Sequence, residues 1–375
     1  MAGSSFGKNF VVTTWGESHG KAVGAVIDGC PAGIELSEED IQKYLDRRKP
    51  GQSDMTTARK EDDKAEILSG VFEGKTTGTP ISVMIRNSDQ HSADYSNIKD
   101  VYRPGHADYT FQKKYGIRDY RGGGRSSGRE TVGRVMGGAV AAKILSSLGI
   151  KATAYTLSVG DIKAENIDLS MINENPLFMP DNEAAKRAEE YIRECRENND
   201  SVGGVIECRI TGMPVGIGET VFDKLDANLA KAMLSIGSVK GFEIGSGFEA
   251  AKKNGSENND PFYADEDGNI NKKTNNAGGV LGGMSDGSDI VFRIAVKPTP
   301  SIAREQKTVE ESYGPDGKPA KKAQDSKIEI KGRHDPVIMP RAVVVAESMA
   351  MITIADLLLS GMSSRIDSVV ERYTE

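Results

Sequence analysis

Histidine and arginine are the residues of this sequence whose placement points most directly to chemistry. The chain has four histidines, and three of them lie in loops rich in Gly, Pro or acidic residues: His19 in GESHG, His106 in RPGHAD and His334 in GRHDP. Histidine exchanges protons near neutral pH. Because the chain has so few histidines, their presence in three such loops supports acid–base chemistry and a structural role about equally. No HxH or HxxxH spacing occurs, which argues against a metal site.

The segment DYRGGGRSSGRE, residues 119–130, combines four glycines with three arginines and two serines. Gly123 and Gly128 have the spacing of a P-loop, but Arg129 and Glu130 follow in place of Lys-Ser/Thr. A dinucleotide fingerprint also fails, because its third glycine would fall one residue late, at Gly128. An RNA-binding RGG segment is repetitive and disordered, whereas the single RGG here runs into a helical pattern.

The start of that helix indicates an anion site of another kind. Ser127 and Glu130 have the spacing of a capping box, and the free N–H groups of a helix start attract anions. The glycines would let further N–H groups converge, and the segment adds the guanidinium groups of Arg121, Arg125 and Arg129. A glycine-rich cap that packs tightly and binds nothing is the alternative.

Three further loops concentrate residues that suit a charged ligand. RRKPGQS, residues 47–53, is strongly basic but could also be a solvated helix end. GGVLGGMSDG, residues 278–287, leads into a predicted strand, and KPTPS, residues 297–301, follows that strand. Such a loop–strand–loop arrangement could line a flat cofactor.

The composition limits the classes of protein to consider. With 48 basic and 55 acidic residues the net charge is −7, which argues against a general nucleic-acid binder. Three distant cysteines, Cys30, Cys195 and Cys208, predict buried thiols and neither disulfides nor zinc. No apolar signal segment opens the sequence, and Glu347 and Asp356 interrupt its most apolar late stretch. A reducing, cytoplasmic setting is expected.

The elements that must position these loops are mixed strands and helices. Strands are predicted over residues 10–14, 23–28, 65–72, 80–86, 150–159, 204–211, 289–296 and 327–331. Helices are predicted over 37–45, 128–148, 182–198, 219–235 and the last forty residues, with 101–117 irregular. Hairpin-like connections favour an α+β fold. One domain over 1–375 is expected, with exposed polar loops at 254–276 and 307–325 and a close-packed small-residue helix from 128.

Taken together, the motifs resemble those of chorismate synthase. The similarity rests on TTWGESHG, LDRRKPGQS, LSGVFEGKTTGTPI, DVYRPGHADYT, KYGIRDYRGGGRSSGRETVGRV, AGGVLGGMSDG, KPTPSI and GRHDPVIMPRAV, in the order of that family. The resemblance implies an α+β layered sandwich, with helices packed between antiparallel sheets, and a homotetramer. It also implies a 1,4-trans elimination of phosphate from 5-enolpyruvylshikimate-3-phosphate to give chorismate, with reduced FMN and no net redox change.

The resemblance assigns roles residue by residue. It implies that His19 protonates the leaving phosphate, that His106 stabilises the reduced flavin, and that Asp335 assists proton removal. The positions it matches to FMN contacts are Arg125, Ser126, Ser127, Gly237, Ser238, Gly282, Lys297, Pro298, Thr299, Pro300, Ser301 and Arg333. Arg48 matches a position that binds substrate phosphate or NADP.

One departure from the family pattern bears on the loop at 47–54. Asp54 stands where many members carry an arginine, so Arg47, Lys49 or Arg59 would have to supply the missing charge. No added reductase domain is visible, which favours an external source of reduced FMN. A non-catalytic flavin or RNA-binding protein is the rival interpretation, and the histidines in all three motif loops argue against it.

Overall fold

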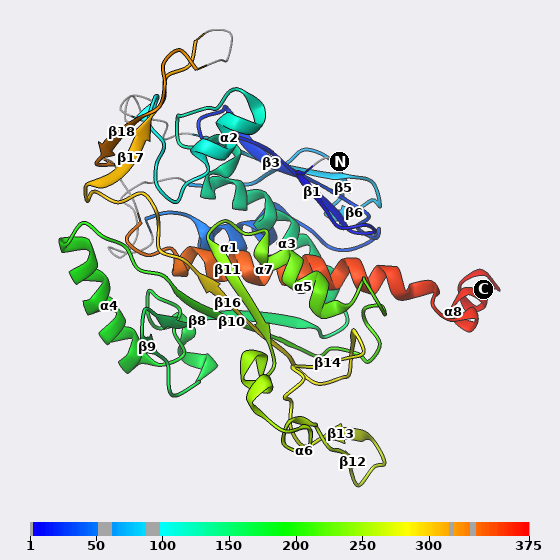
Figure 1. Ribbon diagram of the computed structural model, residues 1–375. Coiled ribbons are helices and arrows are strands. Elements are labelled where there is room, and N and C mark those ends of the chain that lie inside the picture. The colour runs from blue at the N-terminus through cyan, green and yellow to red at the C-terminus, as the bar shows by residue number, and fades with distance from the viewer. Residues whose placement is uncertain (1–2, 52–61, 88–97, 315–318, 331–334, 375) are drawn as a thin grey trace.

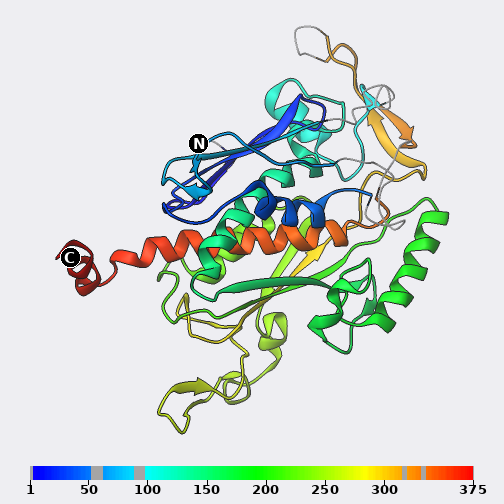
Figure 2. The same cartoon turned by 180° about the vertical axis from the view of Figure 1, so that it is seen from behind.

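Two antiparallel sheets enclose a layer of helices (Figures 1 and 2). The computed structural model describes residues 3–51, 62–87, 98–314, 319–330 and 335–374. The first sheet has the strand order β1-β2-β3-β7-β4 and the second β11-β16-β10-β8-β9. Between them lie α1, α3, α5 and α7, which contact one another and the inner faces of both sheets. This is the α+β layered sandwich that the sequence predicts.

In the first sheet, the strands on either side of the central β3 alternate in burial. It consists of β1 (Ser5–Phe6), β2 (Val11–Gly16), β3 (Ala22–Asp28), β7 (Ile81–Arg86) and β4 (Glu66–Ile67). In β7 the buried side chains are Ile81, Val83 and Ile85, at every second position. A period of two places them on one face of the sheet, where they join the core.

The second sheet repeats this pattern with longer strands. It consists of β8 (Lys151–Val159), β9 (Ile162–Lys163), β10 (Gly204–Thr211), β11 (Val239–Ile244) and β16 (Ile290–Val296). In β10 the alternate residues Ile206, Cys208 and Ile210 are buried. Glu207 lies opposite both Tyr155 and Arg293 in the register, and hydrogen-bonds to both side chains.

The helical layer consists of α1 (Glu38–Arg48), α3 (Thr131–Ser146), α5 (Leu225–Leu234) and α7 (Met339–Ser360). Among the described residues, Met339–Ser363 is the one helical stretch long and apolar enough to cross a membrane. However, 83% of its apolar window is buried within the protein. A helix that is apolar all round also suits the centre of a large core, and Figure 1 shows α7 running between the sheets.

Small residues let α3 approach its neighbours closely, as the sequence predicts. A Cβ atom added at Gly138 would lie 2.5 Å from the Cα of Ser348 on α7. One added at Gly137 would lie 2.7 Å from a Val12 methyl on β2. Real Cβ contacts are essentially never shorter than 3.0 Å. Glycine therefore sets how closely α3 packs between α7 and the first sheet.

The predicted helix starts have mixed outcomes. The capping box at Ser37 and Asp40 is present and opens α1. Before α3, the Ser127 hydroxyl caps the 3-10 turn at residues 128–130 by accepting a bond from the Arg129 N–H. The predicted capping box is wrong, because the Glu130 N–H donates to the Ser127 carbonyl and the Glu130 carboxylate accepts from Arg134 and Thr14.

Several boundaries also differ from the predictions. The segment predicted to be irregular contains α2 (Asp108–Tyr115), and the helix predicted from residue 219 begins only at Leu225. Strand 65–72 is divided into β4 and β5 (Val71–Phe72), because β5 turns back through Glu73 and Gly74, both at positive φ, to pair with β6 (Lys75–Thr76). Cys195 is only half-buried, unlike Cys30 and Cys208.

The two predicted loops have structure of their own. The insert at 254–276 holds α6 (Gly255–Asn258) and a hairpin of β12 (Phe262–Ala264) and β13 (Ile270–Lys272). The second predicted loop overlaps β17 (Gln306–Glu310) and β18 (Gln324–Ile328), which pair as a hairpin. The remaining elements with assigned bounds are α4 (Asn182–Glu197), β14 (Val280–Leu281), β15 (Met284–Ser285), α8 (Ile366–Thr374) and the 3-10 turns η2 (Gly124–Ser126), η3 (Gly128–Glu130), η4 (Leu169–Asn173), η5 (Gly247–Lys252) and η6 (Gly361–Ser363).

Candidate active site

A cavity of about 1170 Å³ lies where the glycine-rich segment meets the helical layer and one edge of the second sheet. Among the described residues, two acidic residues line it, Glu130 and Asp335. The basic residues that line it are Arg48, Arg103, Arg125, Arg129, Arg134, Lys231, Lys240, Lys297 and Arg341. Although the whole chain is acidic, this cavity is strongly positive, which suits a ligand with several negative charges.

The glycine-rich segment forms one wall of the cavity, but its polar groups mostly serve the loop itself. The Arg125 guanidinium donates to the Gly16 carbonyl at 2.9 Å and to the Thr14 hydroxyl at 2.5 Å. The Ser126 hydroxyl and N–H both donate to the Gly123 carbonyl. The Ser126 N–H is therefore not one of the free N–H groups that the sequence predicts in this loop. The positive potential comes from side chains.

His106 lies beside a buried group of two arginines and one carboxylate. Arg103 binds Asp108 through two nitrogens, each at 2.8 Å, and Arg118 approaches the same carboxylate at 3.2 Å. The Nδ1 atom of His106 is 3.0 Å from an Arg103 nitrogen and 3.2 Å from Asp108. Burial alone would raise the pKa of Asp108, but hydrogen bonds from Arg103 and His106 outweigh it and hold that pKa well below its usual range.

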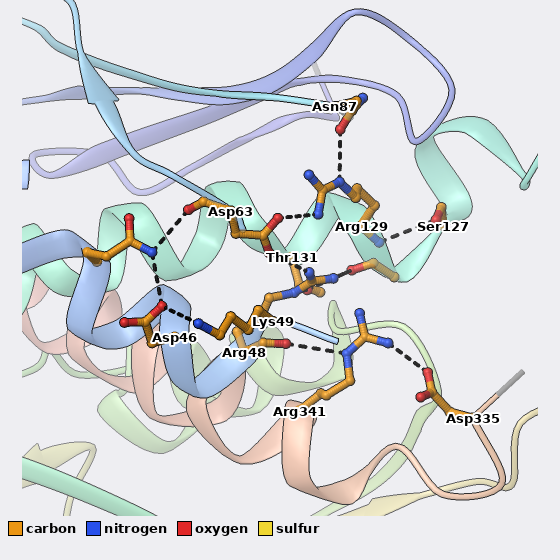
Figure 3. A network of polar contacts seen from close by, with 12 residues as sticks. Asp46, Arg48, Lys49, Asp63, Asn87, Ser127, Arg129, Thr131, Asp335 and Arg341 are labelled. Carbon is orange, nitrogen blue, oxygen red and sulfur yellow. Dashed lines mark hydrogen bonds and ion pairs between the residues drawn. The ribbon is translucent and has the colours of Figure 1, made fainter. Parts of the chain in front are cut away.

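Arg48 and Arg129 share a second buried carboxylate, that of Asp63 (Figure 3). Arg129 contacts one Asp63 oxygen at 2.5 Å and Arg48 the other at 3.3 Å. Arg48 also donates to the Thr131 hydroxyl and to the Gly128 carbonyl. These bonds join the end of α1 to the start of α3, so the network holds the glycine-rich segment against the helical layer.

Asp335 lies four residues before α7. Its carboxylate accepts a hydrogen bond from the Arg341 guanidinium at 2.6 Å (Figure 3). Arg341 also donates to the Arg48 carbonyl, at 3.3 Å. Asp335 and Arg341 both line the cavity. The predicted proton-accepting carboxylate therefore lies beside a cation and within reach of a bound ligand.

The second sheet contributes the opposite wall through the segments 237–240 and 297–301. Lys297 follows β16, and its ammonium donates to the Gly105 carbonyl at 3.3 Å. Burial, with a smaller contribution from nearby Lys240, lowers the pKa of Lys297. The Thr299 hydroxyl is buried and has no hydrogen-bond partner among the described residues. An unsatisfied buried hydroxyl in a cavity wall is suited to bind a ligand.

Most predicted site residues lie together in this cavity. Those that line it are Arg48, His106, Arg125, Ser126, Ser127, Gly237, Ser238, Lys297, Thr299, Pro300, Ser301 and Asp335. His19 is not in the lining but lies against Gly122, which is. Arg121 is exposed and paired with Asp119.

Two predicted contacts lie elsewhere, and others cannot be placed. Gly282 is at the exposed turn of the β14–β15 hairpin, outside the cavity lining. Pro298 is exposed and does not line the cavity either. The predictions for Arg333, His334, Asp54 and Arg59 fall outside the described residues.

The two described candidates for replacing a charge at Asp54 have other partners. Arg47 binds Glu347 through two nitrogens, at 2.7 and 3.0 Å. Lys49 binds Asp46 at 3.0 Å, and neither Arg47 nor Lys49 is in the cavity lining. Both therefore support α1 in this structure.

Sequence reasoning missed several basic residues of the cavity. Arg103 stands in the RPGHAD motif, three residues before His106, and that spacing could have indicated it. Lys231 and Lys240 lie on either side of the segment 237–238 in the sequence, and their spacing matches no known motif. Only the packing of α5 against β11 brings them to the cavity.

Comparison with known proteins settles the family. The family model described as chorismate synthase matches residues 10–359, nearly the whole chain. The chain belongs to the chorismate synthase family. A chorismate synthase of Lachnoclostridium phytofermentans is 61% identical over 380 residues, with 100% of each chain covered. One of Methanosarcina mazei is 54% identical over 363 residues, covering 96% of this chain and 97% of the relative.

A solved structure extends the similarity to the fold. A crystal structure of chorismate synthase has a TM-score of 0.74 to this chain at 32% identity, and the match covers 98% of this chain and 97% of the other. These findings confirm the predicted chorismate synthase family and α+β layered fold. They also confirm the enzyme class, a carbon–oxygen lyase of the shikimate pathway.

Proposed function

We propose that this chain converts 5-enolpyruvylshikimate-3-phosphate to chorismate and inorganic phosphate by 1,4-trans elimination. The observation that carries the proposal is the strongly basic cavity in a chain of the chorismate synthase family. The substrate brings one phosphate and two carboxylates, and arginine binds such groups with paired hydrogen bonds. An acidic protein that concentrates its cations in one cavity selects for such a ligand.

Reduced FMN is the proposed cofactor, and the residues present fit it. The cavity has room for a flavin beside a small substrate, its lining is basic, and the Thr299 hydroxyl lacks a partner among the described residues. We propose that Arg125–Ser127, Gly237, Ser238, Lys297, Thr299, Pro300 and Ser301 hold FMN. When bound, the reduced flavin would lend electron density to the elimination without net redox change.

The proton-handling roles are proposed for three side chains. His19 would protonate the leaving phosphate, and His106 would face the flavin. Asp335 would accept the proton that leaves the substrate ring. The geometry supports His106 and Asp335 through their places in the cavity lining. It supports His19 through its contact with Gly122, one residue from the glycine that His106 approaches.

Arg48 is proposed to act at a substrate-phosphate or NADP site. Its place in the cavity lining supports that role. Its bonds to Asp63, Thr131 and the Gly128 carbonyl give it a second role, which is to hold the cavity wall together.

Activity is tested with purified protein, FMN, a chemical reductant and 5-enolpyruvylshikimate-3-phosphate without oxygen. We expect chorismate absorbance and phosphate release in equal amounts. Neither product appearing would refute the proposed reaction. His19→Ala should lower turnover by roughly 10²–10⁴-fold while FMN still binds. Loss of FMN affinity in that variant instead would show that His19 serves the cofactor.

The organisation of the working enzyme is proposed from the family resemblance. We propose one catalytic domain over residues 1–375, assembled as a homotetramer in the cytoplasm and supplied with reduced FMN from outside. One hydrophobic core that reaches both sheets supports the single domain. We propose neither a nucleic acid nor a membrane as a partner.

A further inference from the structure

Two adjacent glycines of the glycine-rich segment each lie against a different histidine. A Cβ atom at Gly122 would lie 2.5 Å from the Nδ1 atom of His19, and closer still to its Cε1 atom. A Cβ atom at Gly123 would lie 3.0 Å from the Cε1 atom of His106. A side chain at Gly122 would therefore displace the His19 ring or the loop, and one at Gly123 would press on the His106 ring and on the Ser126 hydroxyl, which would lie 3.1 Å from the added Cβ.

The backbone of this pair also requires glycine. Gly122 has φ +68° and Gly123 has φ +89°, in the left-handed region that other residues rarely adopt. Consecutive Cα atoms are about 3.8 Å apart, so the two imidazoles contact neighbouring points of one loop. The loop thereby controls how far apart the two imidazoles can lie.

Polar contacts also orient both rings, and the His106 ring is additionally held 3.2 Å from the buried Asp108 carboxylate. The Nδ1 atom of His106 lies 3.0 Å from an Arg103 nitrogen, and that of His19 lies 3.2 Å from the Ser18 hydroxyl. Ser18 is the neighbour of His19 in the chain, so this bond does not tie the ring to the cavity wall. Gly122 does, because it lines the cavity and touches His19.

We infer that Gly122 and Gly123 are positioning residues, which set where His19 and His106 stand relative to each other and to the cavity. The chemical purpose of this arrangement rests on the proposed function, in which one histidine serves the leaving phosphate and the other the flavin. The arrangement itself rests on geometry alone.

The test compares Gly122→Ala and Gly123→Ala with Gly124→Ala as the matched control. Gly124 belongs to the same loop and also has a positive φ, of +54°. However, the nearest atoms to its added Cβ are 3.9 Å away, on Asp119 and Glu17. Gly124→Ala therefore introduces the same kind of backbone strain without touching a histidine.

The first measurement is NMR of full-length protein labelled with ¹³C at the histidine Cε1 atoms. The chain has four histidines, and His19→Gln and His106→Gln variants assign the two signals. We expect Gly122→Ala to shift the His19 signal alone, Gly123→Ala the His106 signal alone, and Gly124→Ala neither. Unmoved signals in the first two variants, or equal shifts in all three, would overturn the inference.

A double-mutant cycle covers the case in which Gly122→Ala is too unstable for NMR. The added methyl group competes with the His19 ring for space, so His19→Ala should restore part of the stability that Gly122→Ala removes. Gly124→Ala should show no such recovery when combined with His19→Ala. Additive losses in both combinations would mean that the Gly122–His19 contact has no energetic consequence, which contradicts the inference.

Catalysis provides the second measurement and separates this inference from the proposed function. A misplacement of about 1 Å can cost about 10²-fold in rate. We expect Gly122→Ala to lower kcat by about that factor with FMN affinity unchanged, and Gly123→Ala to weaken FMN binding. An inactive wild-type protein would refute the proposed function while the NMR result still stood. Shifted signals in variants with unchanged kcat and FMN affinity would refute the positioning role alone.

Discussion

Two buried aspartates each bind two arginines, at least one of which lines the cavity, but the surroundings of the two aspartates differ. Asp63 joins Arg48 and Arg129, whereas Asp108 joins Arg103 and Arg118 and also faces His106. The group around Asp63 contains only permanent cations, since arginine does not lose its proton in proteins. The group around Asp108 also contains the imidazole of His106. Similar residues thus build a permanent brace in one place and a histidine-containing group of the cavity in the other.

The same substitution at both aspartates measures this difference. Asp63→Asn keeps the shape of the side chain and tolerates its positive φ of 47°, but it removes the charge shared by two buried arginines. We expect a loss of about 3–5 kcal/mol in the free energy of unfolding, measured by urea denaturation. If Asp63→Asn lowered the free energy of unfolding by less than Asp108→Asn does, Asp63 would not be the permanent brace.

Asp108→Asn should cost less, about 1.5–3 kcal/mol at pH 5, because Arg118 would still donate hydrogen bonds to three backbone carbonyls. The pKa of Asp108 is depressed in the folded protein, so its stabilisation is complete above its unfolded pKa of about 3.9. The gap between wild type and variant should therefore shrink as the pH falls from about 4 toward 2. A gap that widens on acidification would reverse the assigned sign.

Thr131→Val should have the smallest effect, about 0.5–1.5 kcal/mol. It removes one hydrogen bond from Arg48 and one to the Gly128 carbonyl, and leaves the Asp63 carboxylate in place. The loss of stability in Thr131→Val and in Asp63→Asn is compared by thermal unfolding of both variants. If the two losses were equal, the hydroxyl and not the carboxylate would be the main support of Arg48.

The sequence predicted much of the site because its motifs are local. RPGHAD indicated His106, and two partners that sequence reasoning missed, Arg103 and Asp108, lie within the same six residues. The capped start of the helix after Ser127 was also readable from residue types and spacing. Local spacing is reliable in these cases because the partners are only a few bonds apart along the chain.

The glycine content of a segment did not show where in the fold that segment lies. The segments 119–130 and 278–287 are both dense in glycine, and both were predicted to line one ligand. The first segment lines the cavity, whereas the second contains the exposed turn of the β14–β15 hairpin at Gly282, outside the cavity lining. Glycine content shows that a backbone must turn or approach closely, but it does not show what the backbone approaches.

By itself the sequence determined the family, the alternation of the strands, the apolar helix at the core and the histidine-bearing loops. The family follows from the resemblance of the ordered motifs, and the other features follow from residue type and periodicity, which are properties of short stretches. Only the tertiary structure decided that Asp63 joins Arg48 to Arg129 and that Lys231 and Lys240 reach the cavity. It also decided that Gly122 and Gly123 each meet a histidine. Those contacts depend on how distant segments pack, and no local pattern encodes the distance between them.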